Sequence, residues 1–130
     1  MTDLKIAIKM LNSYKNLIMN FDKNIKKWKK YGDHDKCLFC RKYYKQSNYI
    51  FFDKACYHCP LAAINDSLVD DVYGCSDKSL DKLSDLLDIY FERYHTDYND
   101  KYNIIDAAME RYTILEMALI DKQVIDVNWE

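Results

Sequence analysis

Two pairs of cysteines with the same spacing constrain this chain of 130 residues more than any other feature. Cys37 and Cys40 form the first pair, Cys56 and Cys59 form the second, and 15 residues separate the pairs. This spacing is typical of a zinc site with four cysteine ligands. Zinc prefers a tetrahedron of thiolates about 2.3 Å from the metal, and each two-residue spacer lets one turn present two sulfurs. We therefore predict a structural zinc knuckle in the middle of the chain.

The fifth cysteine, Cys75, leaves the choice of the four ligands open. It would either replace one of the paired cysteines or lie near the metal as a buried thiol. His34 and His58 are further candidates, because zinc also accepts imidazole. His58 stands between two cysteines that already have the preferred spacing, so we expect it to point away from the metal.

Other uses of these cysteines fit the sequence less well. An iron–sulfur cluster would need one of the recognised ferredoxin spacings, and a redox dithiol would need a βαβ setting. A catalytic zinc keeps an open coordination position, whereas four thiolates close the shell. The chain also lacks an HExxH pair, a glycine-rich phosphate loop and a GxSxG motif. We therefore predict a protein without enzymatic activity.

The first thirty residues carry a continuous apolar seam. Only two glycines and one proline interrupt the whole chain, which favours helices over a many-stranded sheet. Apolar residues recur in steps of three and four, which predicts one long amphipathic helix over residues 1–31. Thr2 or Asp3 would cap its first turn. The seam would pack within the chain, and the alternative is a coiled-coil dimer. Its members are Leu4, Ala7, Leu11, Tyr14, Ile18, Phe21, Ile25 and Trp28.

Two more helices are predicted after the cysteines. The first covers residues 79–95, with Ser79 as its cap and apolar residues again in steps of three and four. The second covers residues 103–122, where Asn103 and Asp106 resemble a capping box. The apolar positions are Leu80, Leu83, Leu87, Tyr90 and Tyr94 in the first helix, and Ile105, Ala108, Tyr112, Leu115 and Leu119 in the second.

These elements define the expected fold class. Residues 33–76 form the zinc-binding module, in which two β-prone runs at 43–44 and 49–52 flank a polar turn and predict a small β-hairpin. The expectation is a mostly α protein with one domain over residues 1–130, in which the long N-terminal helix and the two C-terminal helices pack as a helical bundle.

Charge is distributed unevenly along the chain. Residues 1–60 carry 13 Lys and Arg against 5 Asp and Glu, whereas residues 61–130 carry 6 against 16. One interpretation is that basic and acidic helices pack together and neutralise each other. The other is that a basic surface meets nucleic acid, or that an acidic surface meets a basic partner. We favour the first interpretation.

A basic stretch between Lys23 and Lys45 suggests nucleic-acid binding as an alternative function. Lysines would contact phosphates while interleaved aromatic residues, Trp28 among them, stack on bases. The competing interpretation places Trp28 in the core and the lysines at a solvated helix end, where the helix dipole favours them. The candidate nucleic-acid-binding residues are Lys26, Lys27, Lys29, Lys30, Arg41 and Lys42.

The sequence also bears on the compartment. The N-terminal segment lacks the features of a secretory signal, and no apolar run approaches the ~20 residues that span a bilayer. We therefore expect a cytoplasmic protein that does not contact a membrane. In a reducing compartment the cysteines would hold metal rather than form disulfides.

From Trp28 onward, the order of motifs resembles a group of small cysteine-rich proteins encoded by bacteriophages and prophages. The resemblance covers about half of the chain, and the order of the five cysteines with Pro60 is its most specific part. It departs after Cys75, where Ser76-Asp77-Lys78 stands in place of a Thr-Pro-Tyr step, and residues 79–95 look like an addition. The shared motifs are Trp28-Lys29-Lys30-Tyr31, Cys37 with Cys40, Cys56 with Cys59-Pro60, Gly74-Cys75 and Ala107-Ala108-Met109-Glu110.

The resemblance implies a phage origin, a module stabilised by Zn²⁺ and a place for Cys75 in the metal environment. It implies no reaction mechanism. We therefore expect an accessory protein of the host cytoplasm that binds and modulates a host protein, with a defence component as one candidate partner.

Overall fold

The computed structural model describes residues 1–29, 38–39, 42–43, 59–61, 78–92 and 98–130. Its elements are α1 (Asp3–Met19), α2 (Phe21–Asn24), the 3-10 helix η1 (Ile25–Trp28), α6 (Lys78–Glu92) and α7 (Tyr98–Asp121). The predicted fold class is confirmed: the described residues are mostly helical, with a long N-terminal helix and two C-terminal helices. The predicted β-hairpin lies outside the described residues except for Tyr43.

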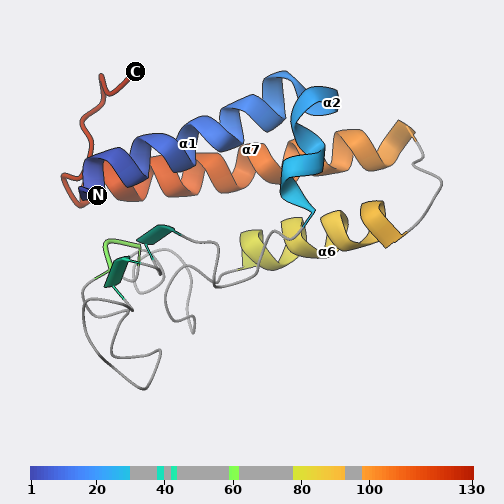
Figure 1. Cartoon of the computed structure of the whole chain (residues 1–130), viewed down its shortest axis with the longest axis horizontal. Coiled ribbons are helices and arrows are strands. Elements are labelled where there is room, and N and C mark those ends of the chain that lie inside the picture. The colour runs from blue at the N-terminus through green and yellow to red at the C-terminus, as the bar shows by residue number, and fades with distance from the viewer. Residues whose placement is uncertain (30–37, 40–41, 44–58, 62–77, 93–97) are drawn as a thin grey trace.

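α7 is the central helix of the described fold. It packs against α1 and against α6, and Figure 1 shows that both of these helices run antiparallel to it. Residues from all three helices join one core, in which the largest fully buried side chains include Leu11, Leu17, Leu83, Leu87, Ile104 and Leu115.

α1 begins as the sequence predicts but ends earlier. The side chain of Thr2 accepts a hydrogen bond from the backbone nitrogen of Lys5 (3.2 Å), so Thr2 is the N-cap. The predicted helix over residues 1–31 is wrong in its extent, because α1 ends at Met19 and Asn20 leaves the helical region with φ −136° and ψ 61°. The lysines at positions 26, 27 and 29 therefore do not lie at the end of α1, and its last turn carries no basic residue.

Asparagine side chains account for this break. The amide nitrogen of Asn24 donates to the carbonyl oxygens of Asn16 (3.1 Å) and Asn20 (2.8 Å). These carbonyls belong to the last turn of α1 and its C-cap, and that of Asn16 also accepts the backbone N–H of Asn20 (2.9 Å). The side chain of Asn24 thus bridges the end of α1 and its C-cap, and α2 starts in a new direction.

The apolar seam stays on one side of the chain through the break. Trp28 of η1 meets Tyr14 of α1 edge to face, with 4.9 Å between ring centroids, and Phe21 of α2 meets Tyr90 of α6 at 5.7 Å. Except for exposed Leu4 and half-buried Ile18, all predicted seam residues are buried within this one chain. The seam is therefore unavailable for the coiled-coil dimer considered above.

The two C-terminal helices differ from prediction at their starts. α7 begins at Tyr98 rather than residue 103, so Asn103 is an exposed residue inside a helix and not a cap. Ser79 lies in the first turn of α6 and is buried, and its hydroxyl accepts a hydrogen bond from Nη1 of Arg111 (3.4 Å). Arg111 is itself buried, so a polar contact fixes the position of α6 along α7.

A left-handed residue ends α7. Gln123 has φ 60°, and its backbone nitrogen donates to the carbonyl of Ile120 while that of Val124 donates to Leu119 (both 2.9 Å). This pair of bonds is a Schellman motif, in which glycine usually takes the left-handed position. The chain then folds back so that Ile125 is buried.

The last residues are held against α7 and α1. The indole nitrogen of Trp129 donates to Oε2 of Glu116 (3.0 Å), and the same oxygen accepts a hydrogen bond from the hydroxyl of Tyr112 (2.9 Å). Nζ of Lys15 lies 2.7 Å from Oε1 of Glu130. This bond with Lys15 holds the pKa of the Glu130 carboxyl below its usual range. The tail is therefore a folded segment.

None of the described helices combines the length and the apolar character that crossing a membrane requires.

Candidate metal centre and charged surfaces

One of the five cysteines lies in the described part of the chain. Cys59 is half-buried and packs against the core, whereas Cys37, Cys40, Cys56 and Cys75 lie outside the described residues. No group of three or more candidate ligands occurs among the described residues. The four-cysteine zinc site therefore stays a prediction.

Described residues next to the predicted ligands belong to the core. Phe39, which lies between Cys37 and Cys40 in the sequence, is fully buried, and so is Leu61, two positions after Cys59. Both belong to the same apolar core as the helices, and Leu38 and Tyr43 pack against it. Each predicted cysteine pair thus has a buried apolar residue within or just after it.

A small polar cluster joins this module to the start of α1. The carboxylate of Asp3 accepts a hydrogen bond from the Tyr43 hydroxyl at one oxygen and pairs with Nζ of Lys42 at the other, both at 2.7 Å. Nζ of Lys42 also lies 5.2 Å from the centroid of the Tyr43 ring. Asp3 sits in the first turn of α1, where the helix dipole favours a negative charge.

The electrostatics of the cluster keep Tyr43 protonated. Burial raises the pKa of Tyr43 well above its ordinary value, and the hydrogen bond to Asp3 and the charge of Asp3 raise it further. A charge on Cys59 raises the pKa of Tyr43 in the same direction. Tyr43 is therefore a hydrogen-bond donor to the carboxylate across the neutral pH range. This contact could not be predicted from the sequence, because a pairing 40 positions apart leaves no periodic signal.

The predicted nucleic-acid residues are divided by the structure. Lys26, Lys27 and Lys29 are exposed around η1, Lys42 is paired with Asp3, and Lys30 and Arg41 lie outside the described residues. Trp28 is buried against Tyr14, so its ring is not available to stack on a base. The interpretation that places Trp28 in the core is confirmed.

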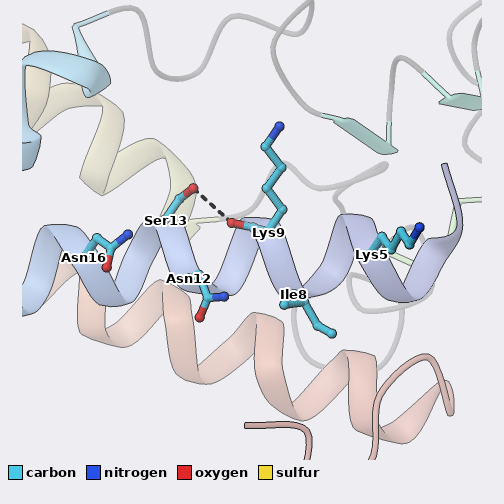
Figure 2. A pocket seen from close by; sticks show the side chains of 6 residues that line it. All are labelled: Lys5, Ile8, Lys9, Asn12, Ser13 and Asn16. Carbon is cyan, nitrogen blue, oxygen red and sulfur yellow. Dashed lines mark hydrogen bonds between the residues drawn. The ribbon is translucent and has the colours of Figure 1, made fainter.

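A shallow hollow lies on the outer face of α1 (Figure 2). The hydroxyl of Ser13 donates to the backbone carbonyl of Lys9 (3.0 Å), a common local bond on a helix surface. No His, Cys or carboxylate lines the described part of this hollow, so it has the character of a polar surface. The lining residues are Lys5, Ile8, Lys9, Asn12, Ser13 and Asn16, and only Ile8 is half-buried.

The outer face of α6 carries a row of carboxylates. Asp81, Asp85, Asp88 and Glu92 are all exposed and recur in steps of four, three and four, so they lie on one side of the helix. None of the four forms an ion pair with another described residue. Like charges at such spacings destabilise a helix by about 0.2–0.5 kcal/mol per pair. Repulsion within the row therefore destabilises α6. The spacing of these carboxylates is already present in the sequence.

Exposed apolar side chains lie on α7. Tyr102, Met109 and Met117 are 44%, 50% and 57% exposed, and they are seven and eight positions apart, which is close to two helical turns in each case. Asp106 and Glu110 are exposed between them. An outer face of this kind differs from that of α1, where lysine and asparagine predominate.

Among the residues that the structure describes, ion pairs do not join the basic and acidic halves of the chain in a general way. Lys15 and Glu130 do connect them. The Lys101–Asp22 pair has the opposite arrangement, because the acidic group comes from the basic half (3.2 Å). α1 and α7 instead contribute buried apolar residues to one core. Many exposed charges of both signs thus remain on the surface of the described helices.

No family model, no curated protein and no solved structure matches this chain. The resemblance to phage-encoded cysteine-rich proteins therefore stays a prediction.

Proposed function

We propose that this chain is a non-enzymatic accessory protein, stabilised by zinc and encoded by a phage, that binds and modulates a host protein in the host cytoplasm. A component of host defence is the candidate partner. The protein acts by presenting a helical surface, and the zinc holds the module between α1 and α6.

The exposed apolar row of α7 carries this proposal. Single exposed apolar residues are normal on protein surfaces, but Tyr102, Met109 and Met117 follow one side of a helix over about four turns. Methionine and tyrosine are enriched where proteins meet, because both bury a large area and Met adapts its shape. A row of this kind is better suited to a protein partner than to solvent.

The zinc site has a structural role in this proposal. Phe39 and Leu61 tie the chain beside two predicted ligands to the core, and Tyr43 ties it to Asp3. A metal bound by Cys37, Cys40, Cys56 and Cys59, or with Cys75 in place of one of them, would hold these anchor residues at fixed spacing.

Affinity capture from host lysate, run with and without nuclease, tests the proposal. The expected result is one host protein recovered in both conditions. Capture that disappears on nuclease treatment would show binding through nucleic acid instead, and capture of no protein at micromolar bait would contradict the proposal. A variant with Met109→Ser and Met117→Ser should lose the partner, whereas Met19→Ser, at an exposed methionine on α1, should retain it.

Nucleic-acid binding is the second candidate function, and three exposed lysines around η1 favour it. Lys26, Lys27 and Lys29 could contact phosphates without help from Trp28. Each phosphate contact adds about −0.9 to the slope of log affinity against log salt for duplex DNA. Changing the three lysines to glutamine should flatten that slope, whereas Lys5→Gln with Lys9→Gln on the outer face of α1 should not. Affinity that does not fall with salt would exclude this mode.

A further inference from the structure

The outer faces of α6 and α7 form one continuous surface. Nζ of Lys82 lies 3.6 Å from Oε2 of Glu110, and Ser79 is bonded to Arg111, so the two helices have a fixed register. Because they are antiparallel (Figure 1), moving two turns along each helix from the Lys82–Glu110 pair leads to Ile89 and Asn103. Both of these residues are exposed. The acidic row of α6 and the apolar row of α7 therefore belong to the same side of the molecule.

This surface combines carboxylates and apolar side chains around the Lys82–Glu110 ion pair. Its carboxylates are Asp81, Asp85, Asp88 and Glu92 of α6 with Asp106 and Glu110 of α7. Its apolar members are Ile89, which is 38% exposed, and the α7 row of Tyr102, Met109 and Met117. We call this set the α6–α7 face.

We propose that the α6–α7 face is a docking surface for a basic amphipathic helix of a partner protein. The inference rests on the proposed function, since it names the surface and the chemistry of the partner. The carboxylates would meet lysine and arginine side chains, and the apolar side chains would meet the apolar stripe of the incoming helix.

The spacing of the carboxylates excludes a metal ion as the occupant. Successive carboxylates follow one another along the helix, about 5–6 Å apart at Cβ, and so do not converge on one point. A cation site needs several oxygens at about 2.0–2.6 Å from one ion. Nucleic acid and anionic membranes are also disfavoured, because their phosphates would face carboxylates of the same sign.

The size of the surface fits a protein partner. α7 has 24 residues and is therefore about 36 Å long, and a helix with its side chains is about 10–12 Å wide. α6 has 15 residues and is about 22 Å long, so the two helices side by side offer roughly 600–700 Å², somewhat below the ~800 Å² that one partner contributes to a standard interface. One incoming helix would cover the central part of this area.

The test uses the full chain with its bound metal and a defined probe. The probe is a synthetic amphipathic helical peptide of about 18 residues, with lysines in steps of three and four on one side and leucines beside them. Fluorescence anisotropy measures its affinity, and backbone amide shifts in NMR spectra locate it. We expect shifts that concentrate in residues 81–92 and 102–117. Shifts confined to α1 and η1 would overturn the proposal.

Matched variants distinguish peptide binding at the α6–α7 face from nonspecific electrostatic attraction to the protein. The first variant, Asp85→Asn with Asp88→Asn, removes two carboxylates from the α6–α7 face. The control, Asp22→Asn with Asp126→Asn, removes two exposed carboxylates outside the α6–α7 face and changes the net charge equally. The first variant should weaken peptide binding roughly tenfold and the control less than about twofold. Equal weakening in both would overturn the proposal.

Other occupants of the α6–α7 face would give different results in these experiments. Salt-sensitive self-association that Asp85→Asn with Asp88→Asn abolishes would place a second copy on this face and overturn the proposal. Binding of a duplex DNA that competes with the peptide would do the same. If the peptide binds to the α6–α7 face while host capture recovers no protein, the proposed function is contradicted and the inference about the α6–α7 face is supported. If a host protein is captured equally well by the two variants and the peptide does not bind, only this inference fails.

Discussion

Tyr43 donates a hydrogen bond to Asp3 across 40 positions of the sequence, with 2.7 Å between the hydroxyl and the carboxylate. The bond joins the predicted zinc module to the first turn of α1. Lys42 satisfies the second oxygen of the same carboxylate. Lys42 and Tyr43 are therefore held at the start of α1 by polar contacts that do not themselves require a metal.

Tyr43→Phe should lower the free energy of unfolding by about 1–2 kcal/mol, because it removes a hydrogen bond to a charged group. Urea denaturation followed by circular dichroism measures the change. Lys42→Gln is the control: its ion pair is partly exposed, so the loss should stay within about 1 kcal/mol. A Tyr43→Phe variant as stable as the parent would show that the contact does not hold the module.

Removing zinc should destabilise the protein more than any surface substitution. Structural zinc sites supply on the order of 10 kcal/mol of binding energy, which becomes folding energy when the ligands are unordered without metal. Chelation or Cys37→Ser should therefore lower the melting temperature markedly, and Cys75→Ser should lower it less. Native mass spectrometry should find one zinc and one reactive thiol per chain. A melting temperature that chelation leaves unchanged would refute the structural role of the metal.

Stability should fall at alkaline pH in a way that depends on Tyr112. Burial and the hydrogen bond to Glu116 raise the pKa of Tyr112 in the folded protein above its ordinary value of about 10. A raised folded pKa stabilises the fold fully below the unfolded pKa, and this contribution is lost as pH rises beyond about 10 toward the folded pKa. Urea denaturation at pH 8 to 11 should show a steeper decline in the parent than in Tyr112→Phe. Identical slopes would contradict the prediction.

Gln123→Gly should stabilise the protein. Gln123 adopts φ 60°, a left-handed conformation that costs a non-glycine residue about 1–2 kcal/mol. Glycine avoids this cost but loses more entropy on folding, so the expected net gain is about 0.5–1 kcal/mol. Asp121→Gly, at the last residue of α7, relieves no left-handed conformation and should instead cost up to about 1 kcal/mol. Thermal denaturation distinguishes the two, and destabilisation by both would contradict the prediction.

The sequence predicted the helices well because their packing is periodic. Ala7, Leu11 and Tyr14 are buried in α1 as their spacing requires, and Leu115 and Leu119 are buried in α7. The end of α1 at Met19 could not be predicted from this periodicity, because Phe21, Ile25 and Trp28 keep the same spacing after the chain changes direction. The signal was the set of asparagines at positions 16, 20 and 24, which compete with the backbone for hydrogen bonds.

Less of the candidate site could be predicted from the sequence. The cysteine spacing identifies possible ligands, but the contacts that position the module, Tyr43 to Asp3 among them, are long-range and aperiodic. The burial of Arg111 was also not foreseen, because a charged residue in a helix is normally solvated. Such contacts depend on which helices become neighbours, and that is decided by the whole fold.

The central place of α7 has a consequence for how the protein is made. The ribosome releases α1 first, but the helix that covers its apolar side comes near the end of the described chain. At about 5–20 residues per second, the delay of roughly 100 residues lasts about 5–20 s. During that interval nascent chains carry an uncovered apolar stripe. Translation products that stop before α7 should therefore be the species that chaperones bind and proteases remove.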